Sequence, residues 1–193
     1  MHRVAAIILA AGGSTRFGAP KQLLEFRGET LVAHAARCAC EGGCDRVLVL
    51  AGAAHAELVD ALTGTAARVI AHADWSRGIG STIAYGVRAL RSEKPDALVL
   101  LACDQPLVTP SIISALIRQH DLGRKPIVAS RYAHTLGIPA LFDASCFDAL
   151  ENLLPESGAK SLIHARANDA VAFPDGAIDI DTLADFERLR ARE

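Results

Sequence analysis

A glycine-rich segment with two cations is the part of the sequence best suited to phosphate chemistry. It reads LAAGGSTRFGAPK from residue 9 to residue 21 and directly follows an apolar run. Glycines let main-chain N–H groups approach an anion closely. Arg16 and Lys21 are the only charged residues between Arg3 and Glu25. We expect a polyphosphate site here; the structural alternative is a surface turn with two solvated cations.

Two familiar phosphate-binding loops do not fit this segment. A Walker A loop needs a lysine directly after its second glycine. Gly13 and Gly18 have the right spacing, but Ala19 stands in the lysine position. A dinucleotide fingerprint needs G-x-G-x-x-G and an acidic residue at the end of the second strand, and this sequence offers neither at those places. The segment therefore indicates a different kind of nucleotide loop.

Three carboxylates stand where they could act near a phosphate site. Asp104 comes shortly after an apolar run, and an acid at the end of a buried strand can hold a cation near phosphates. Asp179 and Asp181 are two residues apart, so they share a face if that segment is extended. The alternatives are structural: Asp104 could cap a turn, and Asp181 or Thr182 could cap a helix.

The first segment resembles the signature of the MobA-like nucleotidyltransferase family, which includes the molybdenum-cofactor cytidylyl- and guanylyltransferases. The pattern L-A-A-G-x-S-x-R-x-G-x-x-K specifies eight of thirteen positions, and all eight match. Five later segments resemble further family motifs: GIGST at 78–82, DQPL at 104–107, GIPALF at 137–142, GAK at 158–160 and DIDT at 179–182. The alternative for 158–160 is a surface turn that opens a helix. Ile138 departs from the family, since many relatives have His there, and Leu183 replaces a proline.

The resemblance implies a Mg²⁺-dependent enzyme that transfers a nucleoside monophosphate from an NTP to a phosphorylated acceptor and releases pyrophosphate. CTP is the favoured donor, with GTP as the second candidate, because DQPL and DIDT are similar to the cytidylyltransferase branch. Molybdopterin is the favoured acceptor. An acceptor molybdoenzyme or its chaperone is a further expected partner.

The same resemblance assigns roles to individual residues. The catalytic residues are Arg16, Lys21 and Asp104. The nucleotide-binding residues are Leu9, Ala10, Ala11, Gly12, Gly13, Ser14, Lys21, Gly80 and Ser81. The acceptor-binding residues are Gly137 and Pro139. Mg²⁺ is assigned to Asp104, with Asp179 and Asp181 as further metal contacts.

Apolar runs of strand length alternate with segments of helical periodicity. We expect strands at 4–9, 46–50, 67–71, 97–101, 127–130, 136–142 and 171–173. We expect helices at 31–39, 55–62, 81–90, 111–120, 145–153, 161–167 and 183–192. The early strands are continuously apolar, which is typical of a parallel sheet covered on both faces. The fold class is therefore α/β, a three-layer Rossmann-like, mainly parallel sheet with helices on both faces, and the resemblance indicates the nucleotide-diphospho-sugar transferase type. One domain is expected over residues 1–193.

Composition disfavours several other classes of protein. The net charge is −2 and the pI is near 6.4, whereas a nucleic-acid binder that neutralises phosphates is usually much more basic. No apolar run approaches the roughly 18–20 residues of a membrane span. Five cysteines are an odd count, and the spacing of Cys38, Cys40 and Cys44 is not that of a zinc site. The apolar run after Met1 is better explained as a buried strand than as a signal peptide. We expect a cytoplasmic protein without nucleic-acid or membrane partners.

Two other functions stay open at this point. One is a cytidylyl- or nucleotidyltransferase that acts on a sugar or polyol phosphate. The other is a nucleotide-binding module without turnover, although such a module would not need Arg16, Lys21 and Asp104 together.

Overall fold

The computed structural model describes residues 3–13, 17–123, 125–167 and 169–191. These residues form a seven-stranded sheet in the order β5-β4-β1-β6-β8-β7-β9. The strands are β1 (Val4–Ala10), β4 (Arg46–Ala51), β5 (Ala67–Ala71), β6 (Ala97–Ala102), β7 (Ile127–Tyr132), β8 (Thr135–Asp143) and β9 (Asp169–Ala172). Only β8 pairs antiparallel to its neighbours; the other described pairs in this sheet are parallel. The carboxyl ends of β1, β4 and β6 therefore meet at one edge, where ligands bind in open α/β sheets.

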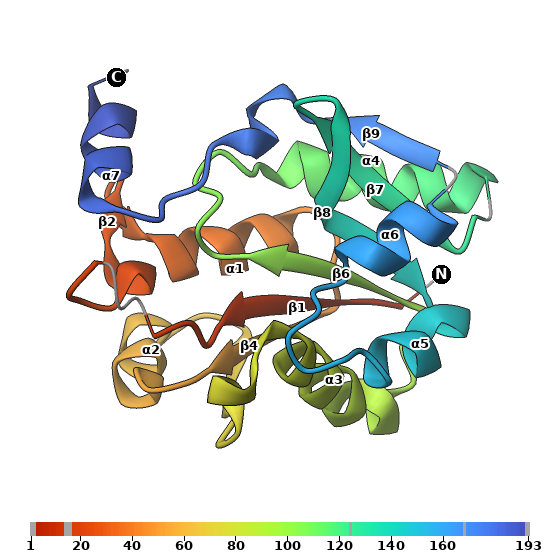
Figure 1. Cartoon of the computed structure of the whole chain (residues 1–193), viewed down its shortest axis with the longest axis horizontal. Helices are drawn as coiled ribbons and strands as arrows, with labels where there is room; N and C mark the ends of the chain where they lie inside the picture. Colours follow the sequence, from red (N-terminus) through yellow and green to blue (C-terminus); the bar gives the residue numbers. More distant parts are fainter. Residues whose placement is uncertain (1–2, 14–16, 124, 168, 192–193) are drawn as a thin grey trace.

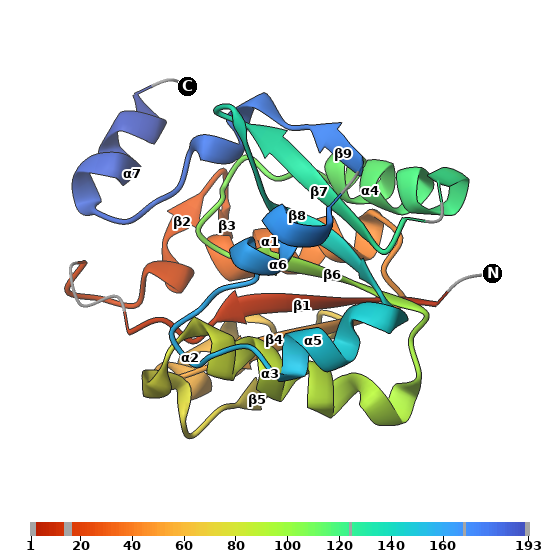
Figure 2. The ribbon, with the colours of Figure 1, turned by 45° about the vertical axis from the view of Figure 1, so that its right-hand side comes forward.

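Helices cover both faces of the sheet (Figures 1 and 2). They are α1 (Leu31–Glu41), α2 (His55–Ala61), α3 (Ile79–Leu90), α4 (Pro110–Gly123), α5 (Phe147–Glu151), α6 (Lys160–Arg166) and α7 (Leu183–Arg190). Because side chains alternate along a strand, β1 contributes to two cores. Ala6 and Ile8 pack in one cluster with α1, α2 and α4. Ala5 and Ile7 pack in the other with α3, α5 and α6. The α/β, three-layer, mainly parallel fold predicted from the sequence is confirmed.

A small hairpin between the first loop and α1 was not predicted. Strands β2 (Glu25–Phe26) and β3 (Glu29–Thr30) pair antiparallel across Arg27 and Gly28. Both turn residues have positive φ, 55° and 81°. Two-residue hairpin turns need this conformation, which is easy for glycine and uncommon for arginine. The strands are only two residues long, so no alternation of side chains marks them in the sequence.

The hairpin supports a third, smaller apolar cluster that lies apart from the two faces of the sheet. Phe26 and Leu31 pack there against Ile180, Phe186 and Leu189. In Figure 1 helix α7 accordingly lies beside β2, at the end of the molecule where β1 ends. This packing brings the segment before α7 to the carboxyl edge of the sheet. The helix was expected to extend to residue 192, but it ends at Arg190.

Short 3-10 turns complete the connections. They are η1 (Lys21–Leu23), η2 (Trp75–Arg77), η3 (Arg91–Glu93), η4 (Ala144–Cys146) and η5 (Pro174–Ala177). None of the described helices combines the length and the apolar character needed to cross a membrane.

Candidate functional site

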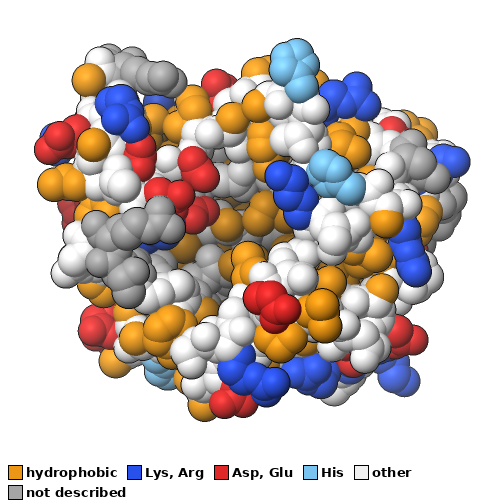
Figure 3. Space-filling model, in the orientation of Figure 1, with side chains coloured by type: hydrophobic (Ala, Val, Ile, Leu, Met, Phe, Trp, Pro, Cys, Tyr) orange, Lys and Arg blue, Asp and Glu red, His pale blue; other side chains and the backbone are white. Residues whose placement is uncertain are grey.

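A cavity of about 380 Å³ opens at the carboxyl ends of β1 and β6. Figure 3 shows a hollow with an apolar floor at this end of the molecule. The lining comes from the first loop, η1, the start of α3 and the end of β6. The lining residues are Leu9, Ala10, Ala11, Gly12, Lys21, Gln22, Trp75, Ser76, Gly78, Ile79, Thr82, Ala102, Cys103 and Asp104. Six residues assigned from the sequence are thus brought together in one cavity: Leu9, Ala10, Ala11, Gly12, Lys21 and Asp104.

Lys21 joins two carboxylates from distant parts of the chain. Its Nζ lies 2.8 Å from Asp104 Oδ2 and 3.0 Å from Asp181 Oδ1. Burial lowers the pKa of Lys21, but the attraction of these two carboxylates outweighs burial, and the pKa is raised above its ordinary value. The ammonium group is therefore charged at neutral pH and partly withdrawn from solvent.

Asp179 is exposed and lines a separate pocket with Asp185 and Arg188. Partial burial raises the pKa of Asp179, and the nearby carboxylates of Asp181 and Asp104 raise it further. The three carboxylates are thus close enough to repel one another at the edge of the cavity that Asp104 lines. A ligand that brings positive charge to this edge is electrostatically favoured.

Main-chain contacts hold the acidic segment in place. The N–H of Ile180 donates to the carbonyl oxygen of Asp104 at 2.9 Å, so residues 179–181 run beside the end of β6. Thr182 then caps α7, and Asp185 completes a capping box with it. Thr182, and not Asp181, is the N-cap, which leaves the Asp181 carboxylate available to Lys21.

The carboxylates fit a divalent cation that also binds phosphates. Mg²⁺ is usually held by one or two carboxylates, with substrate phosphate oxygens and water completing its shell. Asp104 and Asp181 both reach one cationic atom, the Nζ of Lys21, so a pair of carboxylate oxygens already converges there. Among the described residues, no group of three His, Cys, Asp or Glu side chains is placed to hold a metal. Two carboxylates leave most of the coordination positions of such a cation to phosphate oxygens and water.

Gln22 fixes the first loop to η1, a role that the sequence analysis missed. Its side chain is 1% exposed, and its Nε2 donates to the carbonyl oxygens of Ala10 at 2.8 Å and Gly12 at 2.7 Å. The carbonyl groups of the loop thus point toward Gln22. In the sequence, only the position of Gln22 next to Lys21 could have indicated this role.

Trp75 forms part of the cavity wall because Gly52 lets it approach. A Cβ atom at Gly52 would lie 2.3 Å from the carbonyl oxygen of Ala11 and 2.9 Å from the indole ring of Trp75. Only a glycine at the end of β4 leaves room for both. The indole and the first loop are consequently packed on the same residue.

The second glycine segment contributes to the cavity, though through other residues than expected. Gly78, Ile79 and Thr82 line it. The N–H of Gly80 instead donates to the carbonyl oxygen of Pro155 at 2.8 Å, and Ser81 Oγ lies 3.1 Å from His72 Nε2. These contacts give Gly80 and Ser81 a structural role at the start of α3, and their contact with a nucleotide stays a prediction.

The remaining assigned residues lie in three places. Gly137 lines a second cavity of about 180 Å³ beside the first. Pro139 lies in β8, where its carbonyl oxygen accepts from Ser130 Oγ at 2.6 Å. Gly13 is exposed and borders a shallow pocket with Pro20 and Glu57. Ser14 and Arg16 lie outside the described residues.

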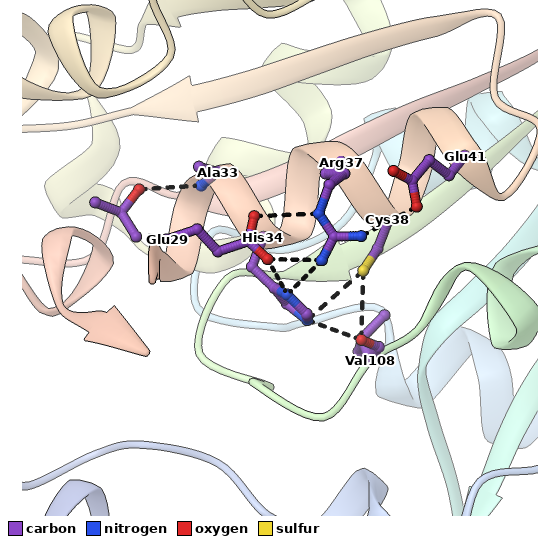
Figure 4. Close-up of polar contacts among 8 residues, drawn as sticks. Glu29, Ala33, His34, Arg37, Cys38, Glu41 and Val108 are labelled. Atoms are coloured by element: carbon purple, nitrogen blue, oxygen red, sulfur yellow. Dashed lines mark hydrogen bonds and ion pairs between the residues drawn. The ribbon is translucent and has the colours of Figure 1, made fainter. Parts of the chain in front are cut away.

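A network on α1 anchors the loop that follows Asp104 (Figure 4). His34 Nε2 lies 2.8 Å from the carbonyl oxygen of Val108, and its Nδ1 lies 2.9 Å from Glu29 Oε1. Arg37 donates to the same glutamate at 2.6 Å and 3.2 Å. The Cys38 thiol also donates to Val108 at 3.4 Å, and burial raises the pKa of that thiol to about 11. Cys38 thus acts here as a buried, protonated donor.

Comparison with known proteins agrees with the geometry. The sequence profile described as MobA-like NTP transferase domain matches residues 6–171. The chain belongs to this family. The NTP transferase is therefore a nucleotidyltransferase with the Rossmann-like fold of that family, and the region that matches contains the first loop, Lys21 and Asp104. The segment of Asp179 and Asp181 lies beyond the match.

This NTP transferase is similar in sequence or structure to three other proteins. It is 32% identical to nicotine blue oxidoreductase of Paenarthrobacter nicotinovorans, over 96% of each chain. It is 24% identical to a probable molybdenum cofactor guanylyltransferase of Bacillus velezensis, over 96% of this chain and 94% of the relative. Rv0371c of Mycobacterium tuberculosis superposes with a TM-score of 0.80 at 29% identity, covering 97% of each chain. Rv0371c has also been solved in complex with manganese, with a TM-score of 0.74.

Proposed function

We propose that this enzyme transfers a nucleoside monophosphate from CTP to a phosphorylated acceptor and releases pyrophosphate. The observation that carries the proposal is the cavity in which Lys21 and Asp104 face each other beside the first loop. GTP is the second candidate donor. Molybdopterin is the favoured acceptor, supported by the motifs at 104–107 and 179–182 and by the relative named as a molybdenum cofactor guanylyltransferase.

The reaction requires charge neutralisation more than proton transfer. An oxygen of the acceptor phosphate attacks the α-phosphorus of the NTP, and the bond from that phosphorus to the bridging oxygen of the β-phosphate breaks. Pyrophosphate leaves with the electron pair. A phosphate monoester has a second pKa of about 6, so the attacking oxygen is already ionised at neutral pH. A general base is therefore not required.

The residues of the cavity would divide this task. The Lys21 ammonium stabilises the charge that develops on the leaving pyrophosphate, as preorganised cations do in phosphoryl transfer. The first loop approaches the phosphates with its main chain, and the Gln22 side chain holds that loop in position. Arg16 is assigned a similar role to Lys21 by the family motif.

Mg²⁺ is the proposed cofactor, held by Asp104 and Asp181. Asp179, the third contact assigned from the sequence, is not placed with these two as one metal-holding group among the described residues. Bound there with the nucleotide, the metal would neutralise phosphate charge and fix the reacting groups in line. Lys21 is salt-bridged to both Asp104 and Asp181, so it must share these carboxylates with the metal.

Two other functions are less well supported. A nucleotide-binding module without turnover would not need a partly buried lysine and a carboxylate in the same cavity. The name of the Paenarthrobacter relative raises redox chemistry, but the cavity concentrates the cation and carboxylates that phosphate transfer uses. A sugar or polyol phosphate stays the alternative acceptor.

The test is titration calorimetry of the purified chain with CTP, GTP, ATP and UTP, with and without Mg²⁺. We expect one Mg²⁺-nucleotide to bind clearly better than the others. Pyrophosphate release is then assayed with candidate acceptors for the wild type, Lys21→Ala and Asp104→Ala, together with thermal melting. Folded variants without turnover support the roles assigned, and normal turnover in either variant contradicts them. Failure of every nucleotide to bind contradicts the proposed function as a whole.

A further inference from the structure

The carboxylate of Asp104 is carried by a short loop between two elements. Strand β6 ends at Ala102, and α4 begins at Pro110. Because Asp104 lies in neither element, its position depends on the contacts that hold the loop. A metal ligand has to be held to within about 0.5 Å of its productive position. Groups that fix this loop therefore bear on the metal proposed for Asp104.

A tight turn forms the second half of this loop. The N–H of Val108 donates to the carbonyl oxygen of Gln105 at 3.3 Å. Pro106 occupies the second position of the turn, where proline presets the backbone angle. The turn is therefore closed by a hydrogen bond and stiffened by a proline. A displacement of Val108 would move Gln105, the neighbour of Asp104.

Side chains hold this turn at both ends. At its beginning, Gln105 Nε2 donates to the carbonyl oxygen of Gly176 at 2.9 Å. At its end, the carbonyl oxygen of Val108 lies 2.8 Å from His34 Nε2 and accepts from the Cys38 thiol at 3.4 Å. The imidazole is the closer of the two donors at Val108, and it is the stronger, since a thiol donates weakly.

The surroundings of His34 keep a proton on Nε2 (Figure 4). A bare Nε2 would place its lone pair against the carbonyl oxygen of Val108, which can only accept. Nδ1 lies 2.9 Å from Glu29 Oε1 and 3.2 Å from Arg37 Nη2. It can donate to the carboxylate when the ring is charged and accept from the guanidinium when the ring is neutral. The donor to Val108 is thus kept in both protonation states.

Water cannot readily replace this donor. Val108 is 1% exposed, and the side chain of His34 is 14% exposed. A buried carbonyl group that loses its donor carries the full cost of its desolvation. The turn would relieve that cost by shifting until the carbonyl oxygen of Val108 reaches solvent.

We propose that His34 is a positioning residue of the transferase: it holds Val108 and, through the turn, sets the carboxylate of Asp104 for Mg²⁺. The part of this role that concerns metal and nucleotide rests on the proposed function, whereas the hold on the turn does not. His34 is not among the residues that line the nucleotide cavity. Its loss should therefore weaken the metal-dependent part of nucleotide binding and spare the part that Lys21 and the first loop provide.

Amide hydrogen exchange of the full chain without nucleotide tests the hold on the turn. An asparagine at position 34 is too short to reach Val108, whereas a glutamine can place an N–H near the position of Nε2. The reporters are the N–H of Val108 and that of Ile180, which donates to the carbonyl oxygen of Asp104 at 2.9 Å. In His34→Asn we expect both to exchange about tenfold faster relative to the amides of β1. His34→Gln should restore slow exchange.

Two results of this experiment would overturn the proposal. One is unchanged exchange of the two reporter amides in His34→Asn. The other is equally fast exchange in His34→Asn and His34→Gln, because the position of the donor would then not matter. Cys38→Ala removes only the longer contact to Val108, so it should show the same pattern at smaller amplitude. It provides the test if His34→Asn does not fold, and unchanged exchange there would then contradict the hold on the turn.

Titration calorimetry with a nucleotide tests the role toward the metal. In the wild type, Mg²⁺ should raise the affinity for the nucleotide. His34→Asn should reduce this gain by about tenfold, as the loss of groups that orient metal ligands does. The affinity without Mg²⁺ should stay as in the wild type. An unchanged gain, or an equal loss of affinity with and without Mg²⁺, would contradict the positioning of Asp104.

His120→Asn is the matched control for the loss of a buried histidine. His120 lies in α4, 3.5 Å from Asp143. Asp143 pairs with Ala97 at the beginning of β6, and Asp104 follows the other end of that strand. The control should lower the melting temperature and leave the Mg²⁺-dependent gain unchanged. The same loss of gain in His120→Asn and His34→Asn would show that general destabilisation is the cause and overturn the proposal.

The nucleotide titration of the wild type separates this proposal from the proposed function. If no nucleotide binds, the proposed function fails, and amide exchange still decides whether His34 holds the turn. If a Mg²⁺-nucleotide binds and His34→Asn keeps the full Mg²⁺-dependent gain, the positioning role is wrong and the proposed function stands.

Discussion

Lys21 Nζ lies 2.8 Å from Asp104 Oδ2, although 83 positions separate the two residues. The first loop supplies the cation and the end of β6 supplies the carboxylate, so neither can be placed without the central sheet. Asp181 approaches the same ammonium group from the C-terminal segment. One lysine thereby holds together three parts of the chain around the cavity.

Removing this lysine should favour metal binding while it abolishes turnover. In Lys21→Met the carboxylates of Asp104 and Asp181 lose their compensating charge, so Mn²⁺ without nucleotide should bind more tightly than in the wild type. Pyrophosphate release should fall by about a hundredfold or more, since a preorganised cation is lost. Paramagnetic resonance of free Mn²⁺ measures the first effect. Lys125→Met is the control for the loss of an exposed lysine. An unchanged Mn²⁺ affinity in Lys21→Met would contradict the idea that Lys21 and the metal compete for Asp104 and Asp181.

Glu29 should stabilise the fold in a pH-dependent way. The hydrogen bond from Arg37 lowers the pKa of Glu29, and a bond from His34 lowers it further against the opposing effect of burial. A lowered carboxyl pKa contributes stability above the unfolded-state pKa, and that contribution is lost as pH falls through the folded-state value. Glu29→Gln should therefore lower the melting temperature at pH 7, by an amount that shrinks under acidic conditions.

The control for this series is Glu41→Gln. Glu41 contacts the same arginine at 3.0 Å, but its side chain is 52% exposed, and exposed ion pairs contribute little. Melting followed by circular dichroism at several pH values separates the two variants. A Glu29→Gln deficit that is the same at pH 4 and pH 7 would show that charge is not its cause.

Gly80 should be intolerant of any side chain for structural reasons. A Cβ atom there would lie 2.0 Å from the carbonyl oxygen of Leu154, which is backbone and cannot move independently. We expect Gly80→Ala to destabilise the protein by about 1–3 kcal/mol in chemical denaturation. Gly158→Ala provides the matched comparison, because its Cβ atom would make only ordinary contact with Ile79. Equal stability of the two variants would refute the packing argument.

Thr182 should affect both stability and turnover. Its side chain accepts from the N–H of Asp185, so Thr182→Ala removes the cap of α7 at a cost of about 1 kcal/mol. The uncapped helix holds Asp181 less firmly against Lys21, and kcat/KM should fall as well. Thr30→Ala removes the corresponding cap of α1, where the threonine accepts from Ala33. Thr30→Ala should lower stability by as much as Thr182→Ala and leave turnover unchanged. A similar loss of turnover in both variants would contradict the role of Thr182 in positioning Asp181.

The sequence predicted the sheet because its strands are short, continuous apolar runs between glycine-rich or polar turns. It also predicted that the first loop and Asp104 meet, since both follow strands whose carboxyl ends share an edge of the sheet. The ion pair between Lys21 and Asp181 could not be predicted from the order of strands in the sheet. It depends on the third apolar cluster, in which Ile180 and Phe186 pack on the hairpin, and no periodicity links those segments.

Side chains that support the site were missed for a related reason. Gln22 and His34 act on carbonyl oxygens, of Ala10 and Gly12 in one case and of Val108 in the other. Every residue has a carbonyl group, so such contacts leave no pattern of residue types. The glycines were recognised, but for Gly80 the reason is the close backbone of Leu154, which only the three-dimensional structure reveals.

The position of Trp75 has a practical consequence. It is the single tryptophan of the sequence, and it stands in the wall of the first cavity. Its emission therefore comes from one place in the molecule, and a nucleobase that stacks on the indole would quench it. The fluorescence of Trp75 would then report binding of the proposed donor. The rate of nucleotide binding could be measured by stopped-flow fluorescence without attaching a label.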